Sequence, residues 1–529
     1  MTNAVDLVTR GYLPRELPPP FTSASLGAFV ATGWNPPGPP HPMRDSFPVK
    51  HNLFRWGALR RELQIPSPLK FVPLCRLIEH NWAALNWHCS QSPMSISTPV
   101  PSMVPNERAI LPRFAPPVLT QRRSHVRATS RYIVRADISR CYPSIYTHTL
   151  EWAMHTKAAV KLARLPGQPT PPWFWARQLD QGFQRLQGNQ TVGIPIGPDP
   201  SLIAAEVLLT RIDLDLVQRL GGRVRAVRRV DDYELGFRTL AEAEYGLAAL
   251  QGALTDYELA LNPSKTKIIE LPEALEPRVI RELRRRTIRS SGTGQRGDLV
   301  ELFDFAFSEV RNSANDGVFP YVMGIASNVP VIPSNWETYQ SLLLQAVVVE
   351  PGVIRQVLSE LLWYQNQGSA ISRMDVADSL EAIIVRHAPL GHGSEVAWAI
   401  WAHIELRIPL SNAELIAIEA TSDPIVALVA LDANQLGLVV RQINTSSWST
   451  SQTIDGLYSD SWLLSYEADI KGWIQRTGPD YIATDPGFLA LRNAGVSFYN
   501  QTVITPNPPQ LTQPSFIPSG GGGGSSSWS

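Results

Sequence analysis

Two adjacent aspartates, Asp231 and Asp232, lie between two stretches that each have the pattern of a β-strand. Apolar and polar residues alternate over 233–238 after the pair, and valines mix with arginines over 223–230 before it. A period of two is typical of half-buried strands, so the segment predicts a β-hairpin with the aspartates at its tip. Such a pair is also ordinary turn chemistry. A surface hairpin more often turns on Asn-Gly or Asp-Gly, however, and two like charges need a cation or a solvent shell. Magnesium is one such cation, because it binds one or two protein carboxylates together with phosphate oxygens and water.

A further carboxylate, Asp137, lies in a second stretch with strand periodicity, residues 132–139. The alternation places Asp137 on the less apolar face of that strand. If this strand lies beside the hairpin in one sheet, Asp137 and Asp231 can hold two metal ions between them. Two metals about 3.5–4 Å apart clamp the attacking and leaving oxygens of an in-line phosphoryl displacement. An isolated aspartate at a strand end is more often a cap or a turn residue, so the prediction depends on the combination.

A loop rich in glycine and proline lies between these two segments. Gly193 and Gly197 permit close backbone approach, and Pro195 stiffens the loop. Asp199 then predicts the N-cap of a helix whose apolar residues recur at helical spacing. A rigid loop that enters a helix is suited to lie against a nucleotide or a template base.

The order of these segments resembles motifs A, B, C and D of a reverse transcriptase palm. Motif A corresponds to Asp137 with an aromatic residue, Tyr142, five positions later (142 − 137 = 5), and the others to "GIPIG", "VDDY" and "LNPSKTKI". More narrowly, "GYLPRELPPPFTS", "ADISRCYPSIYTHTLEWAMH" and "GIPIGPDPSLIAAE" resemble the bacterial abortive-infection and defence-associated reverse transcriptases. The resemblance covers residues 11 to about 269. It implies an α+β right-hand polymerase with fingers, palm and thumb.

The resemblance also implies roles for single positions. Asp137 and Asp231 correspond to the metal-binding carboxylates, and Asp232 to the neighbouring acid that completes the metal site. The implied cofactor is a pair of Mg²⁺ ions, with Mn²⁺ as an alternative. Tyr142 corresponds to the aromatic steric gate that excludes a 2′-hydroxyl. Lys265 corresponds to the motif D lysine that stabilises or protonates the departing pyrophosphate, although Lys267 beside it is a substitute for that role.

The loop that corresponds to motif B departs from the pattern of many template-copying reverse transcriptases. Gly193, Pro195 and Gly197 match the loop under the template and the incoming base, but Ile196 stands where those enzymes carry a glutamine. Isoleucine cannot make the hydrogen bonds of an amide. In the defence-associated group the same departure accompanies DNA synthesis with little or no template, so untemplated synthesis is an open alternative to RNA-templated synthesis.

The charge balance is not that of a general nucleic-acid binder, because the chain has 47 basic and 47 acidic residues and a pI near 7.2. The arginines are nevertheless clustered. We expect Arg123 and Arg127, in the cluster before Asp137, to meet the triphosphate or the template. A solvated surface is the alternative for each cluster. The three clusters are Arg122, Arg123, Arg127, Arg131 and Arg135; Arg219, Arg223, Arg225, Arg228 and Arg229; and Arg278, Arg281, Arg284, Arg285, Arg286 and Arg289.

The chain changes character near residue 290. We expect residues 1–290 to form the fingers, the palm and the start of the thumb, and residues 291–298, rich in Ser, Gly and Thr, to form a linker. Residues 299–505 show repeated helical patterns, among them 373–388, 394–406 and 423–435, which predict an all-α domain of HEAT-like or solenoid type. Residues 506–529 predict a disordered tail with an expression-linker and tag remnant.

Several other features limit the class of protein. The three cysteines show no metal-ligand spacing, and an odd count argues against a disulfide framework. The segment "HAPLGH", residues 387–392, contains two histidines but no partner pair that would complete a zinc site. No signal segment and no apolar run of about 18 residues is present, so we expect a cytoplasmic protein without membrane contact.

The sequence thus predicts a DNA polymerase of the reverse transcriptase family that acts in antiphage defence by untemplated and protein-primed synthesis. Its expected partners are deoxynucleoside triphosphates (dNTPs), the DNA product and further copies of itself, joined through the helical domain. One alternative is an RNA-templated enzyme that uses a dedicated non-coding RNA. Another is a catalytically silent scaffold that binds nucleic acid and oligomerises.

Overall fold

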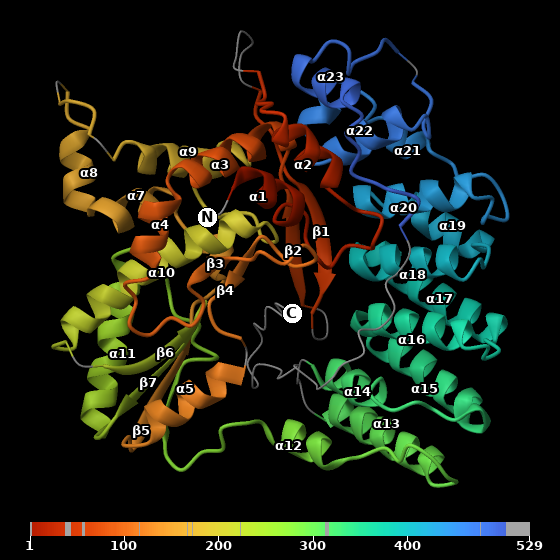
Figure 1. Cartoon of the computed structure of the whole chain (residues 1–529), viewed down its shortest axis with the longest axis horizontal. Helices are drawn as coiled ribbons and strands as arrows, with labels where there is room; N and C mark the ends of the chain where they lie inside the picture. Colours follow the sequence, from red (N-terminus) through yellow and green to blue (C-terminus); the bar gives the residue numbers. More distant parts are fainter. Residues whose placement is uncertain are drawn as a thin grey trace.

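The structure is a computed structural model. It describes residues 3–37, 44–55, 59–115, 117–166, 168–171, 173–222, 224–312, 317–476 and 478–503. The predicted tail 506–529 and Arg223 lie outside these ranges. Figure 1 shows an N-terminal part, residues 3–290, that contains every named strand of the described chain, and a helical part, residues 295–503, stacked along one side of it.

A four-stranded antiparallel sheet forms the centre of the N-terminal part. Its strands are β5 (Tyr132–Asp137), β6 (Arg225–Arg229), β7 (Asp232–Phe237) and β8 (Lys267–Glu270), in the order β6-β7-β5-β8. One face packs on α10 (Asp199–Arg219) and α11 (Leu240–Thr255) through side chains such as Val134 and Leu235, which belong to the main core. The other face packs on α5 (Pro117–Arg127) through Ile133 and Val227, which belong to a second, small apolar cluster.

The remaining elements of the N-terminal part surround this sheet. A separate antiparallel hairpin, β1 (Val49–Phe54) and β2 (Arg60–Ile65), lies between the sheet and the helical part (Figure 1). The other elements are α1 (Ala4–Arg10), α2 (Ala24–Ala31), α3 (Pro68–His80), α4 (Trp82–Cys89), β3 (Pro99–Pro101), β4 (Ile110–Pro112), α6 (Cys141–Ser144), α7 (His148–His155), α8 (Lys157–Ala163), α9 (Trp175–Arg185) and α12 (Arg278–Arg285).

The helical part consists of helices that pack on their sequence neighbours, as in a stack of helix pairs (Figure 1). They are α13 (Gln295–Asn312), α14 (Val318–Ala326), α15 (Trp336–Val349), α16 (Ile354–Asn366), α17 (Arg373–His387), α18 (Gly393–Glu405), α19 (Asn412–Glu419), α20 (Pro424–Gln435), α21 (Ser446–Ser449), α22 (Trp462–Ile470) and α23 (Pro486–Asn493). The helices predicted over 373–388, 394–406 and 423–435 are confirmed within one residue at each end.

Two boundaries differ from the predictions. Helix α13 begins at Gln295, inside the predicted linker 291–298. Asp199 is the first residue of α10, and Pro198 is the N-cap. The Asp199 carboxylate does not cap the helix because it is engaged elsewhere: it accepts hydrogen bonds from Arg108 and from the Ile110 N–H at 2.6 and 2.9 Å.

The two parts share one hydrophobic core, which runs without interruption from Ala4 to Tyr499. The fully buried Trp462 of α22 donates a hydrogen bond from its indole N–H to the Ile65 carbonyl of β2 at 2.9 Å. Near the ends of the chain, the Tyr499 ring packs edge-on against Phe21 with centroids 5.0 Å apart. In Figure 1, α22 and α23 accordingly lie beside α2. The predicted domains are therefore not packed independently of each other.

No helix in the described ranges combines the length and the apolar character needed to cross a lipid bilayer.

The shared core generates a stability prediction. Trp462→Ala removes a fully buried indole and leaves the Ile65 carbonyl without its donor, so it should cost roughly 3–5 kcal/mol of unfolding free energy. Denaturant unfolding followed by far-UV circular dichroism would measure the loss. Trp87→Ala, at a side chain 66% exposed on α4, is the control and should be nearly neutral. A Trp462→Ala protein in which the N-terminal part keeps its full stability would contradict a shared core.

Candidate active site

The three predicted carboxylates meet at one end of the central sheet. Asp137, the last residue of β5, is the direct cross-strand partner of Asp232, the first residue of β7. Asp231 precedes Asp232 in the hairpin turn, and its carbonyl accepts a hydrogen bond from the Ile138 N–H at 3.1 Å. Because directly paired residues of an antiparallel sheet share a face, Asp137 and Asp232 lie on the same face of the sheet. This is the face that α5 covers further along the strands.

The turn itself differs from the prediction, which placed both aspartates at the tip. Its two central residues are Val230 and Asp231, between the paired Arg229 and Asp232. Val230 has a φ of 51°, a left-handed conformation that is costly for a β-branched residue. The Ser97 hydroxyl oxygen accepts a hydrogen bond from the Val230 N–H at 2.9 Å. The turn is thus held in a strained conformation directly before the carboxylates.

Lys265 contacts this group through Asp137. Its ammonium lies 3.1 Å from Asp137 Oδ2, and the Asn262 side chain donates to Asp137 Oδ1 at 3.2 Å. The Asn262 N–H also donates to the Asp137 carbonyl at 2.7 Å, which holds the loop before β8 against the end of β5. Lys267, the substitute considered from the sequence, is exposed on β8. The structure therefore places Lys265 rather than Lys267 beside the carboxylates.

Two of the three carboxylates, Asp231 and Asp232, are destabilised in their charged form. Burial, followed by the charge of Asp137, raises the pKa of Asp231 to about 6. Burial, followed by the charges of Asp231 and Asp137, raises the pKa of Asp232 to about 8. Two half-buried groups that both resist ionisation next to a third, buried carboxylate fit a site for divalent cations, because bound cations would offset the repulsion. Asp137, Asp231 and Asp232 are the residues that could hold them.

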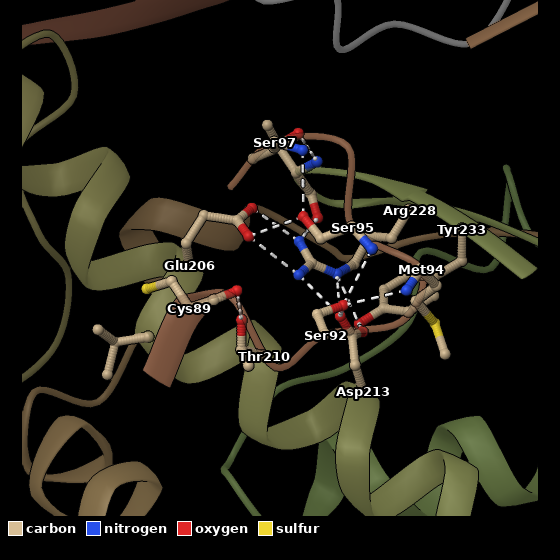
Figure 2. A network of polar contacts seen from close by, with 12 residues as sticks. Cys89, Ser92, Met94, Ser95, Ser97, Glu206, Thr210, Asp213, Arg228 and Tyr233 are labelled. Carbon is tan, nitrogen blue, oxygen red and sulfur yellow. Dashed lines mark hydrogen bonds and ion pairs between the residues drawn. The ribbon is translucent and has the colours of Figure 1, made fainter. Parts of the chain in front are cut away.

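Beneath the hairpin, Arg228 is fully buried and held by two carboxylates of α10 (Figure 2). Its guanidinium donates hydrogen bonds to Glu206 at 2.8 and 3.1 Å and to Asp213 at 2.8 and 2.9 Å. It donates a further hydrogen bond to the Val230 carbonyl at 3.0 Å. The Tyr233 hydroxyl also donates to Asp213, at 2.9 Å. Arg228 belongs to the arginine cluster before the aspartate pair, for which a solvated surface was the alternative to phosphate contact; because its side chain is fully buried, neither applies to Arg228, which instead holds the turn.

Arg123 and Arg127, predicted to meet the triphosphate or the template, instead converge on Glu234 of β7. Arg127 forms two hydrogen bonds with that carboxylate, at 2.7 and 3.0 Å, and Arg123 Nε lies 3.3 Å from it. The Arg123 side chain is 14% exposed and the Arg127 side chain 7%, so neither is a free phosphate-binding group. Burial lowers the pKa of Arg123, and the negative charges of Glu234 and Asp232 partly offset this lowering. Arg123 therefore contributes positive charge near Asp232 from the side.

The third arginine cluster stays more accessible. Arg278, Arg284, Arg285 and Arg289 each form an ion pair with a nearby acid, yet their side chains are between 51% and 77% exposed. This segment, which includes α12, joins the two parts of the molecule (Figure 1). It remains available to bind phosphate.

The predicted steric gate and the glycine loop pack together. The Tyr142 carbonyl accepts a hydrogen bond from the Ile194 N–H at 3.0 Å, and the Gly193 N–H donates to the Ile145 carbonyl at 2.8 Å. The Tyr142 hydroxyl is buried and has no hydrogen-bond partner among the described residues, and burial raises its pKa. Gly193 has a φ of 92°, and an added Cβ would lie 3.3 Å from the Pro143 carbonyl oxygen.

The end of the loop is fixed against the N-terminal segment. Gly197 has a φ of 123°, and an added Cβ would lie 2.7 Å from Pro14. Pro195 is buried and Ile196 is half-buried, with its carbonyl accepting a hydrogen bond from the Gln64 N–H of β2 at 2.9 Å. The buried Arg108 donates to the Gly197 carbonyl at 2.6 Å.

One cation near the site was not singled out from the sequence. Arg61 of β2 is half-buried and forms no hydrogen bond or ion pair with the described residues. Burial and Arg55 lower its pKa, whereas Glu16, Asp231 and Tyr142 raise it, which places the guanidinium within electrostatic reach of the site. The signal in the sequence is the run of arginines at 55, 60 and 61 between two strand-like segments.

A second group of metal-ligating residues lies in the helical part. His387, His392 and Glu395 bring their ligand atoms within 4.8 Å of one another, so Glu395 supplies a neighbour that the sequence analysis did not find. However, Arg60 lies 2.7 Å from Glu395 Oε1 and 2.6 Å from His392 Nδ1. A guanidinium already neutralises the carboxylate there, so this group is an ion-pair cluster.

No protein-family model matches the chain, and no curated protein is similar to it in sequence. Among solved structures, it is similar to telomerase from Candida albicans in complex with a TWJ fragment of telomeric RNA, with 11% identity over 75% of this chain and 64% of that chain and a TM-score of 0.28. It is also similar to apo telomerase from Candida tropicalis, with 12% identity over 76% of this chain and 71% of that chain and a TM-score of 0.31. The chain thus spans less than two thirds of the first of these proteins. Likeness at such TM-scores carries no argument about fold or activity.

The raised pKa values generate a pH-dependent prediction. A carboxyl group whose folded pKa lies above its unfolded value costs stability as pH rises from the unfolded towards the folded pKa. For Asp232 this window runs from about 4, its ordinary value, to about 8. With a chelator present to remove divalent cations, Asp232→Asn should therefore stabilise the protein more at pH 9 than at pH 5. The gain in unfolding free energy should be larger at pH 9 by at least about 1 kcal/mol.

Denaturant unfolding at the two pH values would measure this difference. The matched control is Asp378→Asn at an exposed aspartate of α17, which should show no comparable pH-dependent gain. An equal effect of Asp232→Asn at both pH values would contradict a raised pKa of Asp232 in the folded protein.

Proposed function

We propose that this protein is a nucleotidyltransferase of the reverse transcriptase type that makes DNA from dNTPs with two divalent cations. The observation that carries the proposal is the meeting of Asp137, Asp231 and Asp232, from β5 and from the turn and first residue of the neighbouring hairpin. Around them lie Lys265, which contacts Asp137, and an aromatic ring, Tyr142, on the short helix α6 that follows β5. This arrangement is suited to phosphoryl transfer.

Chain extension would need no nucleophile from the protein, because the 3′-hydroxyl of the growing strand attacks the α-phosphate and pyrophosphate leaves. Asp137, Asp231 and Asp232 would hold two Mg²⁺ ions, or Mn²⁺ in their place. When bound, these ions lower the cost of deprotonating the hydroxyl and balance the charge of the triphosphate. Because Asp231 and Asp232 resist ionisation, binding of the cations would release protons from these carboxyl groups.

Two cations of the chain would act on the phosphates. Lys265 pairs with Asp137 in the absence of a metal ion. If Asp137 ligates a metal ion, the Lys265 ammonium would be free to stabilise or protonate the pyrophosphate. Arg61, without a hydrogen-bonding partner among the described residues, would bind the triphosphate from the β1–β2 side.

The finer function is proposed from the sequence motifs. Their resemblance to bacterial defence-associated reverse transcriptases supports a role against phage. Ile196 in place of an amide supports synthesis with little or no template. Priming from a hydroxyl of the protein itself would leave the product covalently joined to the chain.

The decisive experiment uses purified protein, half of it treated with nuclease, incubated with magnesium and labelled dNTPs without added template. Product in the nuclease-treated half that stays with the protein through denaturation and leaves after proteolysis is the expected result. Product only where co-purified RNA survives would favour the RNA-templated alternative. If neither half makes product but the protein still protects cells against phage, the scaffold is favoured.

The carboxylates provide the matching variant. Asp231→Asn is nearly isosteric but removes one charged ligand, so incorporation should fall by at least about a thousandfold, equivalent to several kcal/mol of transition-state stabilisation. Initial incorporation rates at saturating magnesium would measure it. Asp378→Asn on α17 should retain wild-type rates. A scaffold would keep its phage protection in the Asp231→Asn variant, whereas an enzyme would lose it.

Tyr142 generates a prediction about sugar selection. Tyr142→Val should relax discrimination against ribonucleotides by about 10–100-fold, since the ring that would contact the 2′-position is removed. The measurement is the ratio of kcat/KM for a dNTP and the matching ribonucleotide. Tyr245→Val, at a tyrosine 61% exposed on α11, should leave the ratio unchanged. An unchanged ratio for Tyr142→Val would contradict the steric-gate role.

A further inference from the structure

The β1–β2 hairpin contacts the helical part through residues on both of its faces. Arg60 Nη1 lies 2.7 Å from the fully buried Glu395 carboxylate of α18, and the Asn52 amide donates to the Gly391 carbonyl at 3.0 Å. Phe54 packs so closely on Gly352 that an added Cβ there would lie 2.4 Å from its ring. These three hairpin residues share a face, because Phe54 and Arg60 are cross-strand partners and Asn52 is two positions from Phe54.

A further contact is made on the opposite face of the hairpin, by the buried His51, which is the cross-strand partner of Leu63. Its Nδ1 is 2.8 Å from Asp423 Oδ2, at the residue that caps α20. Gly393, the first residue of α18, lies directly beside this pair, since an added Cβ would be 1.9 Å from Asp423 Oδ2 and 2.9 Å from His51 Nδ1. The absence of a side chain at Gly393 is therefore what allows the histidine and the aspartate to meet.

Arg61 lies on the same face of the hairpin as His51, because its cross-strand partner is Leu53, two positions from His51. Successive residues of a strand point to opposite faces, so Arg61 points away from the side on which Arg60 meets Glu395. Arg61 is also the guanidinium within electrostatic reach of Asp231 and Tyr142. The carbonyl of Ile196, in the glycine loop, accepts a hydrogen bond from Gln64 of this strand. Strand β2 thus connects the helical part both to the glycine loop and to Arg61, whose guanidinium has no hydrogen-bond or ion-pair partner among the described residues.

We propose that Arg60, Glu395, His51 and Asp423 are positioning residues through which the helical part holds Arg61 in place for the triphosphate of the incoming nucleotide. The inference rests on the proposed function for its nucleotide, but the joint itself is a property of the fold. It assigns the helical part a role in nucleotide affinity. The β1–β2 hairpin is accordingly held in position before the nucleotide arrives.

Gly393→Ala is the variant that tests the joint, because its methyl group enters the His51–Asp423 contact. The matched control is Gly324→Ala in α14 of the same helical part, where an added Cβ meets nothing within 4 Å. We expect Gly393→Ala to speed hydrogen exchange in residues 49–54 and 60–65 and to raise KM for dNTPs about 5–10-fold, with kcat within about twofold. Gly324→Ala should change neither quantity.

A double-variant cycle separates positioning from general destabilisation. If Gly393→Ala acts through Arg61, adding it to Arg61→Ala should raise KM no further than Arg61→Ala alone. A merely destabilised protein would instead lose active fraction, which lowers kcat and leaves KM unchanged. Glu395→Gln, which weakens the pairing with Arg60 without adding volume, should reproduce the rise in KM.

Each contrary outcome is informative. Unchanged exchange in the hairpin of Gly393→Ala would overturn the joint. Faster exchange with an unchanged KM, or additive effects in the double variant, would overturn the positioning of Arg61. Absence of DNA synthesis by the wild-type protein would overturn the proposed function and the nucleotide role of Arg61 with it, whereas exchange in the hairpin would still decide whether the joint exists.

Discussion

The buried Arg228 is the interaction on which the candidate active site depends. A guanidinium without access to water is tolerable only when paired carboxylates and hydrogen bonds replace its hydration, and Glu206 and Asp213 of α10 supply them. The same group donates to the Val230 carbonyl, so the charge network also restrains the turn that carries Asp231. Since α10 begins at the glycine loop, one helix sets the positions of the loop and of the hairpin. The strained φ of Val230 persists because both of its backbone polar groups are held.

Local patterns predicted the elements well and the partners of charged residues poorly. Alternation over 132–139 and 233–238 anticipated β5 and β7, and helical spacing anticipated α17, α18 and α20, because these signals lie within one element. The destinations of Arg123, Arg127 and Arg228 depend on acids that lie elsewhere in the chain and meet them only in the folded sheet and on α10. A run of arginines therefore could not show which members would stay free. Arg61 was missed for the same reason.

The helical part was expected to be a separate domain, since its composition and periodicity change near residue 290. The structure instead merges it with the N-terminal part, through Trp462 on Ile65 and through the contacts of β1 and β2. Sequence periodicity shows that a helix has an apolar face but not which surface covers it. Polar residues between the two parts are paired as well, since the buried His51 lies 2.8 Å from the half-buried Asp423.

The pairing of the two ends of the chain has a consequence for biosynthesis. The backbone of Thr22 donates to Phe498, and that of Asn500 donates to Pro20, so the first helices complete their packing only when the last residues have left the ribosome. A nascent chain that already contains Asp137, Asp231 and Asp232 still lacks the elements that cover β1, β2 and α2. Premature termination would then yield a chain with exposed apolar surface, a target for chaperones and proteases. Such an order of assembly would couple completion of the N-terminal part to synthesis of the helical part.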